Sequence, residues 1–179
     1  MINDTDRELV DRAIGGDERS FESLIERHYL PVYQLSFKWC RVKEDAEEIT
    51  QEVFIKLSRK LNTFNHRSTF KTWLYRIVIN TAKDYTRKNS AKRLYESAFA
   101  EAHPGEKGDD PTDDPVDEQR VYDAIDTLPH KQKAALMLVI AEGLSHKEAA
   151  HILDCSETTV SWRIHQARNA LKKIFNRVV

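Results

Sequence analysis

The sequence LSHKEAAHILDCSETTVSWRIHQARNALKK, at residues 144–173, holds two short helical patterns on either side of a three-residue break. Ser145 followed by Glu148 is a capping box, which predicts that a helix starts there. Asp154, Cys155 and Ser156 supply a tight turn, and Ser156 is also a good N-cap for the next helix. The stretch therefore predicts two helices joined by a sharp turn, as in a helix-turn-helix.

The second of these helices has an apolar and a polar side. We expect Val160, Ile164, Ala167 and Leu171 to pack against Ala149, Ala150 and Ile152. The polar side offers donors and acceptors for base edges in a DNA major groove, with flanking arginines suited to phosphates. The predicted contacts are Thr158, Thr159, Ser161, Trp162, Arg163, His165, Gln166 and Arg168. The alternative is a generic helical hairpin whose outer face is only solvent-exposed. An outward Trp162 weighs against that alternative, although packing of Trp162 on a neighbouring helix stays open.

The composition of the 179 residues, 32% charged and 40% hydrophobic, is ordinary for a soluble helical protein. Cys40 and Cys155 form no metal-ligand spacing and predict two reduced thiols, with oxidation or metal sensing at Cys40 as an alternative. No apolar run approaches the roughly 20 residues of a membrane span, and the acidic N-terminus does not resemble a signal peptide. We therefore expect a cytoplasmic protein without membrane insertion.

The net charge of −1 hides an alternation along the chain. Residues 71–93 carry seven basic side chains against one acidic, and residues 157–179 carry five against one. Between them, residues 96–118 carry nine acidic side chains against one lysine. Two basic patches around an acidic stretch predict two contacts with a polyanion. The alternative is that each patch is only a solvated helix face.

Apolar periodicity predicts helices over 6–39 with a break at 15–17, over 44–61 and over 70–94. Shorter helices are predicted over 117–127, 130–142, 145–152 and 157–175. Between the two groups, Pro104, Pro111 and Pro115 punctuate an acidic segment with almost no apolar content. We predict an all-α fold of two small domains, 1–95 and 117–179, joined by a flexible acidic linker, 96–116.

The helix predicted over 70–94 has two faces. Phe70, Leu74, Ile77, Val78, Thr81 and Tyr85 are expected to face a core. The expected outward ridge is Trp73, Arg76, Asn80, Lys83, Asp84 and Arg87. An aromatic ring, an amide and cations on one ridge suit a single nucleic-acid strand, because rings stack on bases and cations bind the backbone.

The preceding helix is acidic, with five carboxylates and two lysines over residues 43–56. It would repel DNA, so we expect it to face a basic protein surface. A metal or acid–base site is the weaker alternative, because no histidine lies nearby in sequence. An enzyme is not expected, since there is no nucleophile–base arrangement and no glycine-rich phosphate loop. We predict no catalytic residue, no metal ligand and no cofactor.

Four segments in this order, RELVDRAIGGDERSFESLIERHY (7–29), DAEEITQEVFIKL (45–57), FKTWLYRIVINTAKDYTRK (70–88) and the terminal hairpin, resemble the sigma-70 family in its short extracytoplasmic-function (ECF) form. The resemblance implies that 1–95 is sigma domain 2 and 117–179 sigma domain 4. It also implies a role in promoter-specific initiation, with core RNA polymerase, through its β′ clamp helices and β subunit, promoter DNA and an anti-sigma factor as partners.

The same resemblance assigns roles to residues. Glu48, Gln51 and Glu52 would contact the β′ clamp helices. The loop Asn65, His66, Arg67, Ser68 and Thr69, together with the outward ridge, would recognise and open the −10 element, and the hairpin would read the −35 element. The linker would occupy the RNA-exit path or act as a plain spacer.

The chain departs from the family at Ser161 and Gln166, where members often carry basic residues, which predicts a different −35 preference. It also lacks the adjacent tryptophan pair of primary sigma factors. A stand-alone helix-turn-helix regulator, whose N-terminal domain senses a ligand or dimerises, is the alternative function.

Overall fold

The computed structural model describes residues 4–99 and 118–176, and these residues form helices and no strands. The N-terminal helices are α1 (Asp6–Ile14), α2 (Glu18–Cys40), α3 (Lys43–Lys60) with a 3-10 turn at Leu61–Thr63, and α4 (Phe70–Phe99). The C-terminal helices are α5 (Glu118–Asp126), α6 (His130–Leu136), α7 (His146–Leu153) and α8 (Glu157–Phe175). The predicted all-α class is confirmed.

The helix boundaries follow from local capping. Thr5 and Glu8 form a capping box that starts α1, and the Asp17 side chain accepts from the backbone N–H of Arg19 at the start of α2. α2 ends at Arg41, whose φ of 60° places it in the left-handed region. The side chains of Thr5, Glu8 and Asp17 satisfy backbone N–H groups that the start of a helix leaves without partners.

Two helices differ from their predicted extents. The predicted helix over 130–142 begins as α6 but continues as a π-helical turn, Met137–Ala141, which closes with a hydrogen bond from the Glu142 N–H to the Met137 carbonyl. α4 runs to Phe99, so the first residues of the predicted linker are helical. The remainder of that linker, from residue 100, lies outside the described residues.

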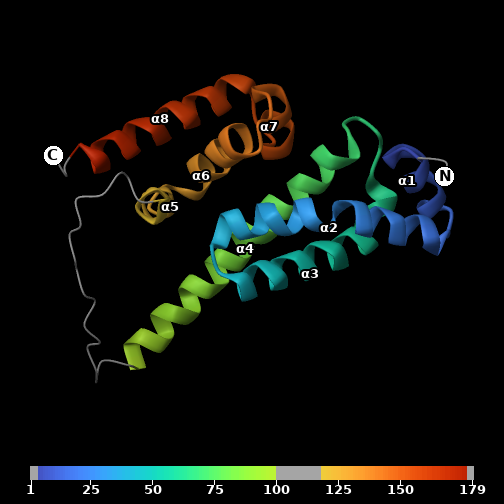
Figure 1. Cartoon of the computed structure of the whole chain (residues 1–179), viewed down its shortest axis with the longest axis horizontal. Coiled ribbons are helices and arrows are strands. Elements are labelled where there is room, and N and C mark those ends of the chain that lie inside the picture. Colours follow the sequence, from blue (N-terminus) through green and yellow to red (C-terminus); the bar gives the residue numbers. More distant parts are fainter. Residues whose placement is uncertain (1–3, 100–117, 177–179) are drawn as a thin grey trace.

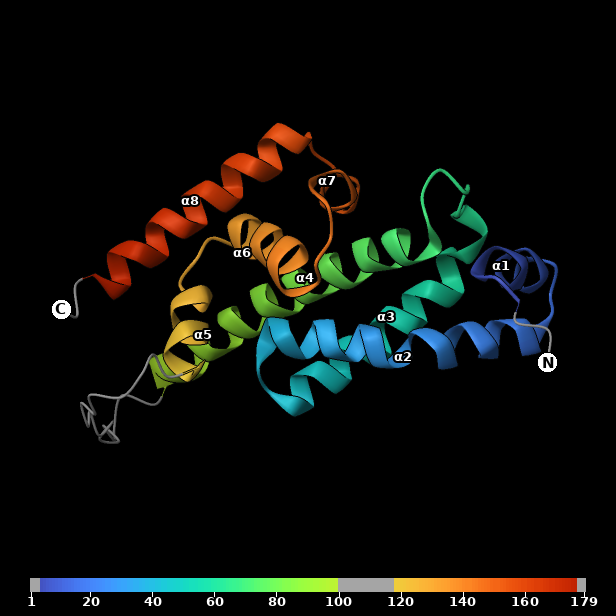
Figure 2. The same ribbon diagram turned by 45° about the horizontal axis from the view of Figure 1, so that its top comes forward.

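One hydrophobic core runs through both groups of helices. Among α1–α4 it includes Val10, Leu24, Val53 and Leu74, and among α5–α8 it includes Leu138, Ala149, Val160 and Ala167. Figures 1 and 2 show α7 lying beside α4, so the two groups are packed together. The sequence predicted two domains but not this contact.

Two features are absent from the described residues. In residues 4–99 and 118–176, no helix is long and apolar enough to cross a membrane. Over the same ranges, no three His, Cys, Asp or Glu side chains form a group that would hold a metal ion.

Candidate nucleic-acid and protein interfaces

The loop between the 3-10 turn and α4 is ordered by its own side chains. Asn65 Oδ1 accepts from the Arg67 N–H at 3.3 Å, and Thr69 Oγ1 accepts from the Thr72 N–H at 3.1 Å, capping α4. Asn65, Arg67 and Thr69 are exposed, whereas His66 and Ser68 are half-buried. The loop therefore presents an amide, a guanidinium and a hydroxyl to solvent beside the start of α4.

The prediction of one outward ridge on α4 holds for two of its six residues, and the other four are half-buried. Trp73 is half-buried, with its ring centroid 5.3 Å from that of Phe64, because an aromatic cluster covers the start of α4. Arg76 Nη2 donates to the carbonyl of His151 in α7, and no partner reaches the buried Arg76 Nε. Lys83 is half-buried, with Arg163 and Lys131 of the C-terminal helices near it.

The electrostatics of Lys83 show how close the C-terminal helices lie. Burial lowers the pKa of Lys83, and the positive charges of Arg163 and Lys131 lower it further. Asn80 and Arg87 remain exposed, as predicted, while the half-buried Asp84 lies 3.1 Å from Arg87 Nη2.

The acidic helix α3 presents Glu48, Gln51 and Glu52 to solvent. These three line a groove of about 240 Å³ between α3 and α4, together with Ile55, Lys56, Thr81, Asp84, Tyr85, Lys88 and Asn89. The Tyr85 hydroxyl lies 2.8 Å from Asp45 Oδ1 and 3.0 Å from Glu48 Oε2, and its single proton can be donated to either carboxylate. Burial and these hydrogen bonds raise the pKa of Tyr85, so the phenol stays neutral and anchors the acidic face on α4.

The C-terminal hairpin has the predicted construction. The Ser145–Glu148 capping box starts α7, Asp154 ends it in the left-handed region at φ 49°, and Ser156 caps α8. The predicted inner face is buried at Val160, Ile164 and Ala167, and on the α7 side at Ala149, Ala150 and Ile152. This packing fixes α8 with its opposite side turned outward.

The outer face of α8 is largely free. Trp162 is 58% exposed, so it does not pack on a neighbouring helix, and Thr158, His165 and Arg168 are also exposed. Ser161 Oγ lies 2.8 Å from His146 Nδ1.

The rest of the predicted −35 set is less accessible. Thr159 and Gln166 are half-buried, and Arg163 is half-buried with Nη1 3.4 Å from Cys155 Sγ. In this arrangement Arg163 lies near Lys83 of α4, whereas its role as a phosphate contact stays a prediction.

Two family models and a known relative match most of the chain. The family models of sigma-70 region 2 and sigma-70 region 4 match residues 24–92 and 118–171. The ECF RNA polymerase sigma-E factor of Haemophilus influenzae is 35% identical, with 94% of each chain covered. The chain belongs to the sigma-70 family, in its ECF group.

Two solved structures share the fold of this sigma factor. CnrH, solved with the cytosolic domain of CnrY, has a TM-score of 0.71 and 26% identity, covering 97% of this chain and 99% of CnrH. The sigma factor RpoE of Bartonella quintana, solved with the anti-sigma factor NepR, has a TM-score of 0.64 and 22% identity, covering 88% and 98%.

Polar contacts that the sequence did not predict join the two halves of this sigma factor. Lys133 is 6% exposed, and its ammonium donates to the Trp39 carbonyl and to Asp126 Oδ1, both at 2.6 Å. Glu142 lies 2.6 Å from Lys38 Nζ and 3.1 Å from the Tyr75 hydroxyl. We call the matched halves domain 2 and domain 4, and this packed state the closed arrangement.

The sequence carries signals for this interface. Tyr75, Ile79 and Ala82 are all buried and lie at helical spacing on a second apolar face of α4. Lys133 begins an apolar run, KAALMLVI, in which a lysine has no place unless it is paired. A helix with two apolar faces is buried on both sides.

Cys40 and Cys155 are both free. Burial raises the pKa of the Cys40 thiol, whose Sγ donates to the Ser36 carbonyl at 3.2 Å. A neutral thiol with a raised pKa is a poor nucleophile, which favours the structural role for Cys40 over a sensing one.

Proposed function

We propose that this sigma factor binds core RNA polymerase and directs it to promoters by contacting two DNA elements. Domain 2, residues 1–95, would bind core polymerase and the −10 element. Domain 4, residues 117–179, would bind the −35 element, with 96–116 as the linker. The match of both sigma-70 regions in one chain carries this proposal. A stand-alone regulator would leave the region 2 match unexplained.

The polymerase contact is assigned to Glu48, Gln51 and Glu52 on α3. These three side chains are exposed, and Ile55 beside them is 46% exposed. Together the four form an acidic surface with an apolar centre. Such a surface suits a basic protein partner, because charge complementarity speeds association and apolar burial slows release. The proposed partner is the β′ clamp helices.

Charge reversal at this surface tests the assignment. The double variant Glu48→Lys and Glu52→Lys is expected to lower core affinity by tenfold or more, a rough figure for like charges brought into contact. Glu26→Lys, on an exposed site of α2, is the matched control and should bind core normally. Normal affinity of the double variant, with the helical fold intact, would remove α3 from the interface.

The −10 contact is assigned to the loop residues Asn65, His66, Arg67, Ser68 and Thr69 and to Trp73, Arg76, Asn80, Lys83, Asp84 and Arg87 of α4. Capture of a flipped base costs a few kcal/mol of unstacking, which contacts in a pocket then offset. The exposed Asn65 amide can read a base edge, and Arg67 and Arg87 can bind backbone phosphates. Arg76 and Lys83 become available only after domain 4 moves away.

The −35 contact is assigned to Thr158, Thr159, Ser161, Trp162, Arg163, His165, Gln166 and Arg168. The exposed side of α8 would lie in the major groove, with Trp162 contacting apolar base edges. Because both domains attach to one polymerase, each DNA contact raises the effective concentration of the other. Neither domain then needs to bind promoter DNA tightly alone.

Regulation is proposed through an anti-sigma factor in the cytoplasm. RpoE of Bartonella quintana was solved with the anti-sigma factor NepR, and CnrH was solved with the cytosolic domain of CnrY. A partner that favours the closed arrangement would keep Arg76, Lys83 and Arg163 away from DNA.

Transcription in vitro tests the whole proposal. Purified core polymerase with this chain is expected to start RNA synthesis at defined positions in a genomic fragment library. The start sites should share two motifs at a fixed spacing. Initiation that is no different from core polymerase alone would overturn the proposal.

A further inference from the structure

Helix α1 holds the rest of domain 2 through two carboxylate–histidine contacts. Asp6 Oδ2 lies 2.9 Å from His28 Nε2, and Asp11 Oδ1 lies 2.9 Å from His66 Nε2. The first contact joins α1 to α2, where His28 is buried. The second joins α1 to the loop that the proposed function assigns to the −10 element. Neither contact follows from the family motifs.

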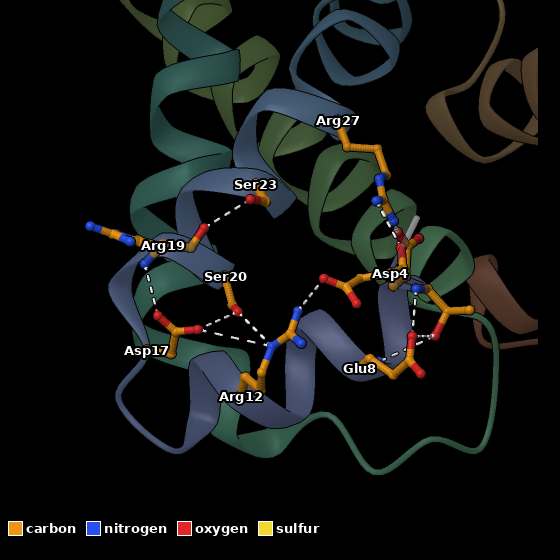
Figure 3. Close-up of polar contacts among 10 residues, drawn as sticks. Asp4, Glu8, Arg12, Asp17, Arg19, Ser20, Ser23 and Arg27 are labelled. Carbon is orange, nitrogen blue, oxygen red and sulfur yellow. Dashed lines mark hydrogen bonds and ion pairs between the residues drawn. The ribbon is translucent and has the colours of Figure 1, made fainter. Parts of the chain in front are cut away.

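The base of α1 is fixed independently of this loop. Arg12 donates to Asp4 Oδ2 at 2.6 Å and to Ser20 Oγ at 2.9 Å, and Ser20 donates to Asp17 Oδ2 at 2.6 Å, as Figure 3 shows. Arg27 Nη1 donates to Asp6 Oδ1 at 2.7 Å. α1 is therefore a rigid support against α2, and Asp11 projects from it towards the loop.

His66 has a backbone conformation that needs support. Its φ of 57° lies in the left-handed region, which residues other than glycine adopt rarely. Its ring packs on Phe64, with centroids 4.7 Å apart, and its Nε2 reaches Asp11. Strained conformations persist where surrounding contacts hold them, and they gather at functional sites. The neighbours on either side, Asn65 and Arg67, are exposed and take their direction from this residue.

We infer that Asp11 is a positioning residue for base selection at the −10 element, acting through His66. This inference rests on the proposed role of the Asn65–Thr69 loop. Asp11 is a poor DNA ligand itself, because a carboxylate repels phosphate. The contact of Asp11 fixes the position of the His66 ring. The ring stabilises the left-handed turn, which sets the directions of the Asn65 and Arg67 side chains. Loss of the contact lets the loop sample other directions, so the correct base loses its advantage over the others.

Promoter selection by the complete holoenzyme tests this inference. Core polymerase with the full-length wild-type chain, Asp11→Ala, Asp11→Asn or Glu26→Ala transcribes a promoter library randomised across the −10 element, and the transcripts are sequenced. Asp11→Ala is expected to reduce the preference for the best base by up to about fivefold, the upper end of the range for an exposed ion pair. Asp11→Asn keeps the size of the side chain and a polar oxygen beside His66 Nε2 but removes the charge, so it should restore part of the preference. Glu26→Ala removes an exposed carboxylate from α2 and should match wild type.

Asn65→Ala separates failure of this inference from failure of the proposed function. If Asn65→Ala changes base preference and Asp11→Ala does not, the loop reads DNA without help from α1, and the inference is overturned. If neither variant changes it, the loop is not a −10 reader and the proposed site falls as well. If Asp11→Ala lowers initiation equally on all sequences, and its thermal midpoint falls, Asp11 has only a structural role, which also overturns the inference.

Discussion

Glu142 connects domain 4 to two residues of domain 2, so Glu142→Ala is expected to open the closed arrangement. Its carboxylate, 12% exposed, accepts from the Tyr75 hydroxyl and pairs with Lys38. Tyr75 is 1% exposed, so its hydroxyl loses the Glu142 carboxylate without gaining access to water. An unsatisfied buried hydroxyl costs about 1–3 kcal/mol. The Lys38 side chain is 35% exposed, so its ion pair adds only about 0.2–1 kcal/mol.

A central estimate of about 2 kcal/mol shifts the ratio of closed to open molecules by roughly 30-fold. Single-molecule energy transfer would measure this ratio with dyes on cysteines at Ser58 and Lys172, both exposed, after Cys40 and Cys155 are replaced by serine. If the open state of the protein with Glu142 is too rare to count, the ratio of closed to open molecules can be measured at a series of urea concentrations.

Tyr75→Phe completes a double-mutant cycle. Without the hydroxyl, Glu142→Ala leaves no unsatisfied donor at Tyr75, so its effect should shrink to that of the Lys38 pair. The reasoning is refuted if Glu142→Ala leaves the ratio unchanged, or changes it by the same factor in both backgrounds.

Three further outcomes are expected. Lys133→Met keeps the apolar stem but removes the donor to the Trp39 carbonyl. It should weaken the packing of domain 4 on domain 2 by about 1–3 kcal/mol in the same energy-transfer assay, and unchanged packing would contradict this. Trp162→Ala should change the free energy of unfolding by no more than about 0.5 kcal/mol, because the ring is exposed. Transcription should fall on promoters that need the −35 element. Equal loss on promoters without that element would argue against α8 as the reader of the −35 element. Burial lowers the pKa of His28 below its ordinary 6.5, so the folded state binds fewer protons than the unfolded state, and stability should fall as the pH falls below about 6.5. His28→Gln should flatten the decline in urea unfolding free energy between pH 7 and 5.5, by at most about 1.4 kcal/mol per pH unit, and an unchanged slope would exclude His28 as its source.

Most of the helices were predictable because their signals are local. The Ser145–Glu148 box, the Ser156 cap and the spacing of Val160, Ile164 and Ala167 depend on residues within two turns of each other. Such short-range features do not depend on what packs against the helix from elsewhere in the chain. The hairpin was therefore predictable almost to the residue.

The accessibility of the candidate site was less predictable because it depends on distant residues. The outward ridge was assigned from the period of α4 alone, which cannot show that α7 covers Arg76 or that Phe64 covers one side of Trp73. The contact between Asp11 and His66 joins residues far apart in sequence, and their charges and spacing offered no signal for it.

The closed arrangement brings Lys83 of domain 2 close to Arg163 and Lys131 of domain 4, so cations from both proposed DNA-binding surfaces oppose one another. Added salt screens this repulsion and thereby favours closure. The same salt weakens binding to DNA phosphates, because releasing counterions into a more concentrated salt solution gains less free energy. The two effects act in the same direction. Promoter occupancy by this protein should therefore fall more steeply with ionic strength than its number of phosphate contacts implies, which couples initiation to the osmotic state of the cell.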